Sequence, residues 1–285
     1  MTTTRRDPDL ENQTGEQSPD EGRDSHGERK HEIESTRPTA GLVYERVKTD
    51  AAEELERPNT ALAFSALFAG FTMGASYLGL ALGATALMGP GGKLVATLLY
   101  PIGYIAVIIG RAQLFTENTL YPIVPSLEDR TVIPKTAQLW ATALAGNLVG
   151  GVFFALVVTK TSALPSEVTQ AFTGLGETAA SRGFTTTFWS AVLAGWLLAL
   201  VAWVVAASEE VIGQFFVIFL LTLPVGLASL DHSVATAIAV MAALVEGQVG
   251  PAEALGWEAT AVLGNALGGV LIVAVINYGQ VRSQR

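Results

Sequence analysis

The chain has 285 residues, is 50% hydrophobic with a mean hydropathy of +0.41, and carries a net charge of −9. It has no cysteine, which excludes disulfides and thiolate metal sites. The acidic balance argues against nucleic acid as a partner. Enzyme signatures such as GxxxxGK[ST] and HExxH are missing from the sequence, so we expect neither an enzyme nor a bound cofactor or metal.

Residues 1–58 carry much of the charge, with 15 of the 26 acids and 9 of the 17 bases, and they contain few large apolar residues. This composition predicts a disordered acidic tail. Residues 36–56 place Val43, Val47 and Ala51 near helical spacing, which allows either a short helix beside the membrane or a linker. The tail lacks an apolar signal segment, so we expect no cleavable signal peptide.

Residues 59–285 are predicted to form a pore domain of six transmembrane helices, since each of six hydrophobic spans approaches the ~20 residues that cross a bilayer. In chain order the spans cover residues 62–88, 94–123, 137–158, 187–207, 211–245 and 254–277. Polar residues break the second span near Thr116 and the fifth at Asp231 and His232, and a longer connection at 159–183 follows the third span. An even number of spans puts both termini on one side, and the basic residues of the loops favour the cytoplasm.

An internal repeat relates the second and third spans to the fifth and sixth. The stretch QLFTEN at 113–118 corresponds to residues 231–236, and GNLVGG at 146–151 corresponds to GNALGG at 264–269, both at an offset of 118 positions. The offset predicts two homologous halves of three helices each. An odd number of helices per half turns the halves in opposite directions, so we predict an inverted repeat with its binding site near midplane, at the broken helices.

His232 is the sharpest candidate for chemistry, because it is the only histidine outside the tail and lies in an apolar region. An ionisable group at bilayer depth costs roughly 2.5 to 3.5 kcal/mol on insertion scales, and such groups usually face a cavity and have a function. We expect His232 to donate a hydrogen bond or a proton to an anion. The alternative is a buried histidine that only ties two helices together. Asp231 would orient His232 or form a charge pair with it.

Thr116 and Ser233 stand where the second half of each broken helix should begin, and both are predicted to be N-cap residues. The positive ends of the two half-helices would then face an anion at the centre. Leu114 and Phe115 are predicted either to form an apolar constriction or to belong to the core.

Glu117 has three possible positions: at a mouth of the pore, paired with Arg111, or along the path. Asn147 and Asn265 belong to the two GNxxGG motifs. They are predicted to hydrogen-bond the broken segments, because unwound backbone in lipid needs polar partners. The glycines of these motifs permit close helix packing.

Four motifs together resemble those of the formate/nitrite transporter family: LFTEN at 114–118, AGNLVGG at 145–151, LDHSVAT at 230–236 and LGNALGG at 263–269. The resemblance covers residues 59–278, and the QLFTEN variant is similar to a less characterised branch. It implies an all-α, aquaporin-like fold of six helices per protomer and a homopentamer with a pore in each protomer. It also implies that His232 is the central pore histidine and that residues 114–116 form the loop that breaks the second helix.

Three departures from the family pattern leave the substrate open. Glu117 stands where many members have a small residue, and Thr236 stands where an asparagine usually follows the histidine motif. Gly195 falls where formate channels place a pore-facing asparagine. For the vestibule lysine known in the family, Lys160 and Arg182 are the candidates.

We therefore expect a multi-pass protein of the inner or plasma membrane that carries small monovalent anions such as formate or nitrite, linked to protons through His232. Its partners would be the anion, protons, membrane lipid and copies of itself. Two alternatives stay open. One is an aquaporin-like pore for small neutral solutes, disfavoured because the twin NPA motifs are missing. The other is a non-conducting scaffold or sensor, for which Glu117 in the path would be the reason.

Overall fold

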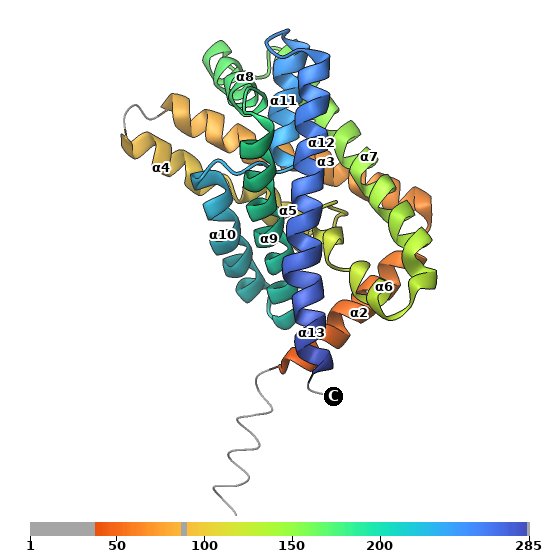
Figure 1. Ribbon diagram of the computed structural model, residues 1–285. Helices are drawn as coiled ribbons and strands as arrows, with labels where there is room; N and C mark the ends of the chain where they lie inside the picture. The colour runs from red at the N-terminus through yellow and green to blue at the C-terminus, as the bar shows by residue number, and fades with distance from the viewer. Residues whose placement is uncertain (1–37, 87–89, 284–285) are drawn as a thin grey trace, which may run out of the picture. The chain divides into compact units, whose positions relative to one another are not determined.

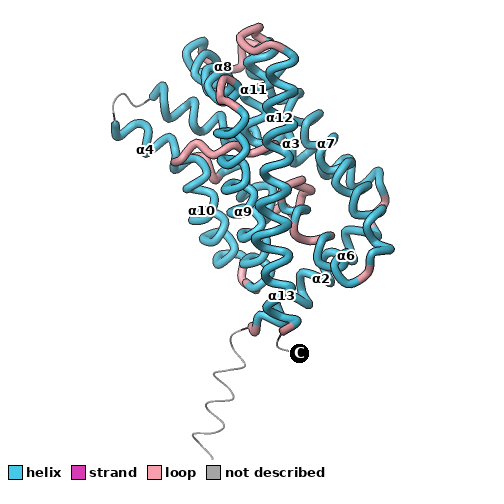
Figure 2. The backbone as a smooth tube through the Cα atoms, viewed as in Figure 1, coloured by secondary structure: helices cyan, strands magenta, loops and turns pink. Residues whose placement is uncertain are grey.

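The computed structural model describes residues 38–86 and 90–283, which form helices joined by loops, as Figure 1 and Figure 2 show. Most of the predicted acidic tail lies outside the described residues. Helix α2 (Ala40–Glu56) begins after Thr39, whose hydroxyl accepts a hydrogen bond from the Leu42 N–H. It occupies most of the segment for which the sequence allowed either a helix or a linker.

The other helices follow in chain order. They are α3 (Asn59–Ala86), α4 (Pro90–Leu99), α5 (Ile102–Ile109), α6 (Ile123–Glu128), α7 (Ile133–Lys160), α8 (Ser166–Ala180), α9 (Phe184–Ala207), α10 (Val211–Leu227), α11 (Ala235–Val245), α12 (Pro251–Leu267) and α13 (Ile276–Arg282). Two short 3₁₀ helices, η1 (Glu117–Thr119) and η2 (Arg130–Val132), and a π-helical segment, η3 (Gly268–Val275), are also present. In Figure 1, α12, η3 and α13 follow one another as one long blue column.

Five helical stretches among the described residues are long and apolar enough to cross a membrane: 59–86, 91–109, 130–160, 184–207 and 251–282. Helices α10 and α11 are apolar but shorter. Large apolar side chains point outward, and Phe64, Phe153 and Leu263 are each more than half exposed. A surface of this kind is suited to lipid or to another apolar surface.

Close backbone contacts join α3 to α7 and α9 to α12. A Cβ added to Gly70 in α3 would lie 2.0 Å from the Asn147 carbonyl oxygen in α7. A Cβ added to Gly195 in α9 would lie 2.2 Å from the Asn265 carbonyl oxygen in α12. Only glycine allows helices to approach this closely. Gly195 therefore faces the backbone of a neighbouring helix.

The second predicted span and the predicted connection at 159–183 differ from the structure. The second span is interrupted already at Tyr100 and Pro101, where proline cannot donate a helical hydrogen bond, and its helix ends at Ile109. The connection at 159–183 contains helix α8, which packs against α11 through one apolar face. The polar opposite face of α8 breaks the run of apolar residues, so a search for continuous spans misses it.

Candidate functional site

Two non-helical segments connect helices inside the apolar region: residues 110–116 after α5, and residues 228–234 between α10 and α11. They are referred to as loop A and loop B, and Figure 2 draws both in pink. Each contains a non-glycine residue with positive φ near its start, 53° at Arg111 and 51° at Ser229. Such conformations are uncommon and persist where the surroundings hold them. The two residues are again 118 positions apart.

Asn147 of α7 holds loop A. Its side-chain oxygen accepts a hydrogen bond from the Phe115 N–H at 2.9 Å. Its amide nitrogen donates to the carbonyl oxygens of Ala66 and Gln113, both at 2.8 Å. One buried side chain thus ties α3 and two points of the loop together.

Asn265 of α12 holds loop B by the same pattern. Its side-chain oxygen accepts a hydrogen bond from the Ser233 N–H at 2.8 Å. Its amide nitrogen donates to the carbonyl oxygens of Ala191 at 2.7 Å and Asp231 at 3.1 Å. The contacts of both asparagines are those expected for partners of unwound backbone.

His232 is fully buried in loop B, and both of its ring nitrogens are engaged. Nδ1 accepts hydrogen bonds from the Ala235 N–H at 2.9 Å and the Val234 N–H at 3.3 Å. Because a backbone N–H only donates, Nδ1 carries no proton, and the neutral ring holds its proton on Nε2. Nε2 lies 2.8 Å from the Thr116 Oγ1. His232 therefore donates to Thr116, and this bond joins loop B to loop A.

Further contacts fix the orientation of the imidazole. The Thr236 hydroxyl oxygen accepts hydrogen bonds from the His232 N–H at 3.0 Å and from the Tyr77 hydroxyl at 2.7 Å. The Tyr104 ring meets the imidazole edge to face, with ring centroids 5.3 Å apart. Nothing in the local sequence pattern of α3 or α5 marks Tyr77 and Tyr104 as neighbours of loop B.

Thr116 stands at the predicted N-cap position, before η1, but without a side-chain cap bond, and the predicted N-cap role of Ser233 is wrong. The Thr116 hydroxyl contacts His232 and makes no cap hydrogen bond to η1. Helix α11 begins only at Ala235, and the His232 ring accepts the first amide hydrogen. The Ser233 hydroxyl is buried without a hydrogen-bond partner in the part of the chain that the structure describes. Loop B runs further than expected, which brings the helix start over the imidazole.

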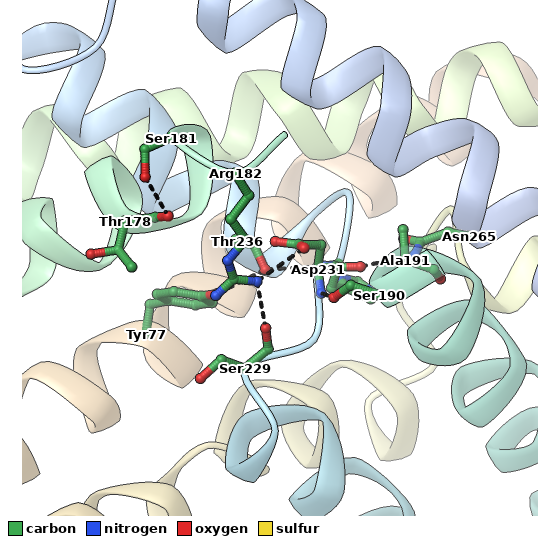
Figure 3. A network of polar contacts seen from close by, with 11 residues as sticks. Tyr77, Thr178, Ser181, Arg182, Ser190, Ala191, Ser229, Asp231, Thr236 and Asn265 are labelled. Carbon is green, nitrogen blue, oxygen red and sulfur yellow. Dashed lines mark hydrogen bonds and ion pairs between the residues drawn. The ribbon is translucent and has the colours of Figure 1, made fainter. Parts of the chain in front are cut away.

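Asp231 pairs with Arg182, as Figure 3 shows, whereas the His232 ring contacts Thr116 and the start of α11. The Asp231 side chain is only 1% exposed, and its Oδ2 lies 3.0 Å from an Arg182 guanidinium nitrogen. The same nitrogen donates to the Ser229 carbonyl at 2.8 Å, and the Asp231 N–H donates to the Ser190 hydroxyl at 2.9 Å. Arg182, in the connection between α8 and α9, therefore neutralises the charge of Asp231 and binds loop B at two points.

The second candidate cation lies elsewhere. Lys160, at the end of α7, is half exposed and pairs with Glu246 at 2.8 Å. Of the two cations considered from the sequence, the structure brings Arg182 to the loop and leaves Lys160 outside it.

A cavity of about 700 Å³ borders loop A. Residues of α2, the end of α5 and the segment where α9 meets α10 form most of the rest of its lining. Its lining includes Gln113, Leu114, Glu117 and Asn118. Leu114 and Phe115 are buried, and Phe115 also packs edge to face on Trp140 with centroids 5.8 Å apart. The cavity lining thus includes Leu114 and Glu117, which lie close to Thr116 in the sequence.

Glu117 lines this cavity and is only 8% exposed. Arg111, considered above as its partner, lies 3.8 Å from Asp50 of α2 instead. The pairing of Glu117 with Arg111 is therefore not found, and its positions at a pore mouth or along the path stay predictions.

Two polar loops enclosed by long apolar helices are the features of a membrane channel or transporter. Residues 41–279 match the family model described as formate/nitrite transporter. The chain is 31% identical over 248 residues to the inner membrane protein YfdC of Escherichia coli (strain K12). The matched segment covers 86% of this chain and 79% of that protein. The chain belongs to the formate/nitrite transporter family.

Other similarities agree with this assignment. A probable formate transporter of Methanothermobacter thermautotrophicus is 29% identical over 206 residues, or 65% of this chain and 74% of that one. The solved structure of an FNT family ion channel has a TM-score of 0.75 at 21% identity, covering 84% of this chain and 98% of that one. A pentameric formate channel with formate bound has a TM-score of 0.66 at 15% identity, covering 80% and 98%. The two solved structures show the fold, and the family consists of transporters and channels and not of enzymes.

Proposed function

We propose that this protein is a proton-linked channel or transporter for small monovalent weak-acid anions of the formate and nitrite type. The observation that carries the proposal is the hydrogen bond between His232 and Thr116, which joins two polar loops within an apolar helical body. The names of the relatives, a probable formate transporter and a formate channel with formate bound, support the substrate class.

The proposed topology has six membrane spans in two inverted halves, with both termini in the cytoplasm. In it, α4, α5 and loop A belong to the second span, while α10, loop B and α11 form the fifth. The matched contacts of Asn147 and Asn265 support this repeat, as do those of Gly70 and Gly195. Three spans per half place the two loops near midplane from opposite sides.

The proposed assembly is a homopentamer in the inner membrane. The fold is similar to that of a formate channel described as pentameric, which supports the pentamer. The relative YfdC is described as an inner membrane protein, which supports the location. The outward apolar side chains would then be covered by lipid and by neighbouring protomers.

In the proposed mechanism, the anion collects near loop A or loop B and passes the centre as its neutral acid. Carrying a bare charge past Leu114 and Phe115 would be costly, and protonation removes that cost. His232 donates its Nε2–H to the Thr116 hydroxyl oxygen. The Thr116 hydroxyl hydrogen can therefore donate to an oxygen of the substrate. On the other side, Arg182 would attract the anion, while Asp231 holds the guanidinium in place.

The neighbouring side chains have supporting parts in this scheme. Thr236 keeps the His232 backbone in position, and the unpartnered Ser233 hydroxyl is free to contact the solute. Since both nitrogens of His232 are already used, the histidine acts mainly as a fixed hydrogen-bond donor and passes a proton on only when Nδ1 gains one.

Flux through purified protein in liposomes tests the proposal. A panel of formate, nitrite, acetate, lactate and hydrosulfide is offered between pH 5 and pH 8, and vesicle swelling in glycerol is followed in parallel. We expect anion uptake with co-moving protons, and loss of most uptake in His232→Gln. Thr222→Val is the control, because the Thr222 hydroxyl bonds only within α10.

Three results would contradict the proposal. Flux and pH dependence unchanged in His232→Gln would remove the role of the histidine. Swelling in glycerol without anion flux would favour a pore for neutral solutes. The lack of both activities would favour a non-conducting scaffold.

A further inference from the structure

Glu117 is a buried carboxyl group at the end of the cavity beside loop A. It is only 8% exposed, its side chain lines the cavity, and it follows directly on Thr116. Among the residues that the structure describes, none forms an ion pair or a side-chain hydrogen bond with Glu117. The carboxyl group therefore faces the cavity without a protein partner.

The cations near the cavity are engaged by other acids. Arg46 pairs with Glu209 at 2.5 Å, and Arg111 lies 3.8 Å from Asp50. Glu54 lines the same cavity as Glu117 and is itself paired with Arg57 at 3.0 Å. A buried carboxylate without a cation, beside a second carboxylate, is costly as an anion and is stabilised by binding a proton.

We propose that Glu117 is the group that gives its proton to the weak-acid anion at the cavity end and regains it from the cavity. This inference rests on the proposed function and assigns the proton linkage to a residue other than His232. His232 is poorly suited to the task, because two backbone N–H groups occupy the nitrogen that would have to take up a proton.

The proton transfer balances without any further reactant. The O–H bond of protonated Glu117 breaks, and a new O–H bond forms on the substrate oxygen, which gives a neutral acid and a Glu117 carboxylate. The neutral acid passes Leu114 at reduced cost. The carboxylate then takes a proton from hydronium in the cavity, so one anion and one proton move together.

The surroundings of Glu117 suit a proton-exchanging group. The charged or titratable side chains that line the cavity with it are Glu45, Arg46, Asp50, Glu54, Arg111 and Tyr121. Ser208 lines it from the connection between α9 and α10, and Gln214 lines it from α10. Helices α7 and η3 meet η1 through Trp140 and Gly269. Burial raises the pKa of the Asp50 carboxyl against the opposing effect of Arg111, so this wall of the cavity also binds protons more readily.

The test compares the pH dependence of formate flux in liposomes for the wild type and Glu117→Gln. Glutamine keeps the shape but cannot donate an acidic proton. In the variant, only acid already neutral in bulk water can cross, so flux falls tenfold per pH unit above the pKa of the acid. We expect a shallower slope in the wild type and a difference of about tenfold or more at neutral pH.

Glu177→Gln is the matched control, since it makes the same chemical change at an exposed position of α8, outside the lining of the cavity. Its flux should stay within about twofold of the wild type at each pH. Infrared spectra supply a readout apart from transport: the wild type should show a protonated-carboxyl carbonyl band at neutral pH that Glu117→Gln lacks. If Glu117→Gln does not fold, Glu117→Asp should keep the shallow slope.

Wild-type flux with the same slope in Glu117→Gln would overturn this inference and leave the proposed function intact. A carbonyl band that is the same in both proteins would overturn it as well. A wild type that carries none of the acids would remove the proposed function, and the inference with it.

Discussion

Loop A and loop B have the same backbone support but different side chains. Each contains a left-handed residue near its start and is held by one asparagine, which makes two hydrogen bonds to the loop and a third to a neighbouring helix. At corresponding positions, however, loop A has Leu114 where loop B has His232, and Glu117 where α11 begins with Ala235. The two halves thus share the backbone support of the loops, whereas the side chains that could react or bind a solute differ between them.

The largest expected effect comes from removing the shared support. Asn147→Leu or Asn265→Leu leaves one buried N–H and two carbonyl groups without their partner, at about 1 kcal/mol or more each. We expect a loss of about 3 kcal/mol or more in the free energy of unfolding of each variant, measured as a lower unfolding temperature in detergent. Asn277→Leu is the control, because Asn277 bonds only to Val273 of its own helical stretch. Tolerance of one replacement but not the other would show that the two supports are not equivalent.

The second effect should touch only loop B. Arg182→Gln leaves the Asp231 carboxylate buried without its cation, which costs about 3 kcal/mol. Adding Asp231→Asn should recover much of this stability, again measured by thermal unfolding. Arg282→Gln, at the exposed end of α13, should have little effect. If Arg182→Gln is as stable as the wild type, the ion pair does not hold loop B.

A third effect concerns the bond between the loops. Thr116→Val removes the oxygen that receives the His232 Nε2–H and should lower flux about tenfold, equivalent to one neutral hydrogen bond. Thr116→Ser keeps the hydroxyl and should transport like the wild type. Equal flux in the valine and serine variants would mean that the two loops act independently.

The smallest effect distinguishes the two cations considered from the sequence. Lys160→Ala breaks an exposed pair with Glu246, so it should cost under about 1 kcal/mol and leave anion flux unchanged. A strong fall in flux in this variant, without a similar fall in Arg182→Gln, would place the anion-attracting charge at Lys160.

Local patterns in the sequence predict the parts of the molecule that depend on local chemistry. The positions of both loops and the hydrogen bonds of Asn147 and Asn265 follow from polar residues within apolar runs. The family match confirms the resemblance read from the four motifs. The pore roles given to His232, Thr116 and the neighbouring residues stay predictions.

Local sequence patterns do not predict contacts between segments that lie far apart in the chain. The pair of Arg182 and Asp231 spans 49 positions, and the bond of Tyr77 to Thr236 spans 159, with no periodic signal to connect them. The capping of α11 by the His232 ring was missed for a different reason. Serine is the better cap former, so propensity pointed to Ser233, while the tertiary position of the loop decided the outcome.

Helix α2 forms one wall of the cavity and is fastened in two different ways. Buried Tyr44 and Val47 anchor it through apolar contact, whereas Arg46, Lys48 and Asp50 fasten it through partly exposed ion pairs. Dissolved ions weaken the second kind of attachment far more than the first. Rising ionic strength should therefore loosen the polar attachment of α2 to the cavity wall, while the apolar anchor of Tyr44 and Val47 keeps its strength.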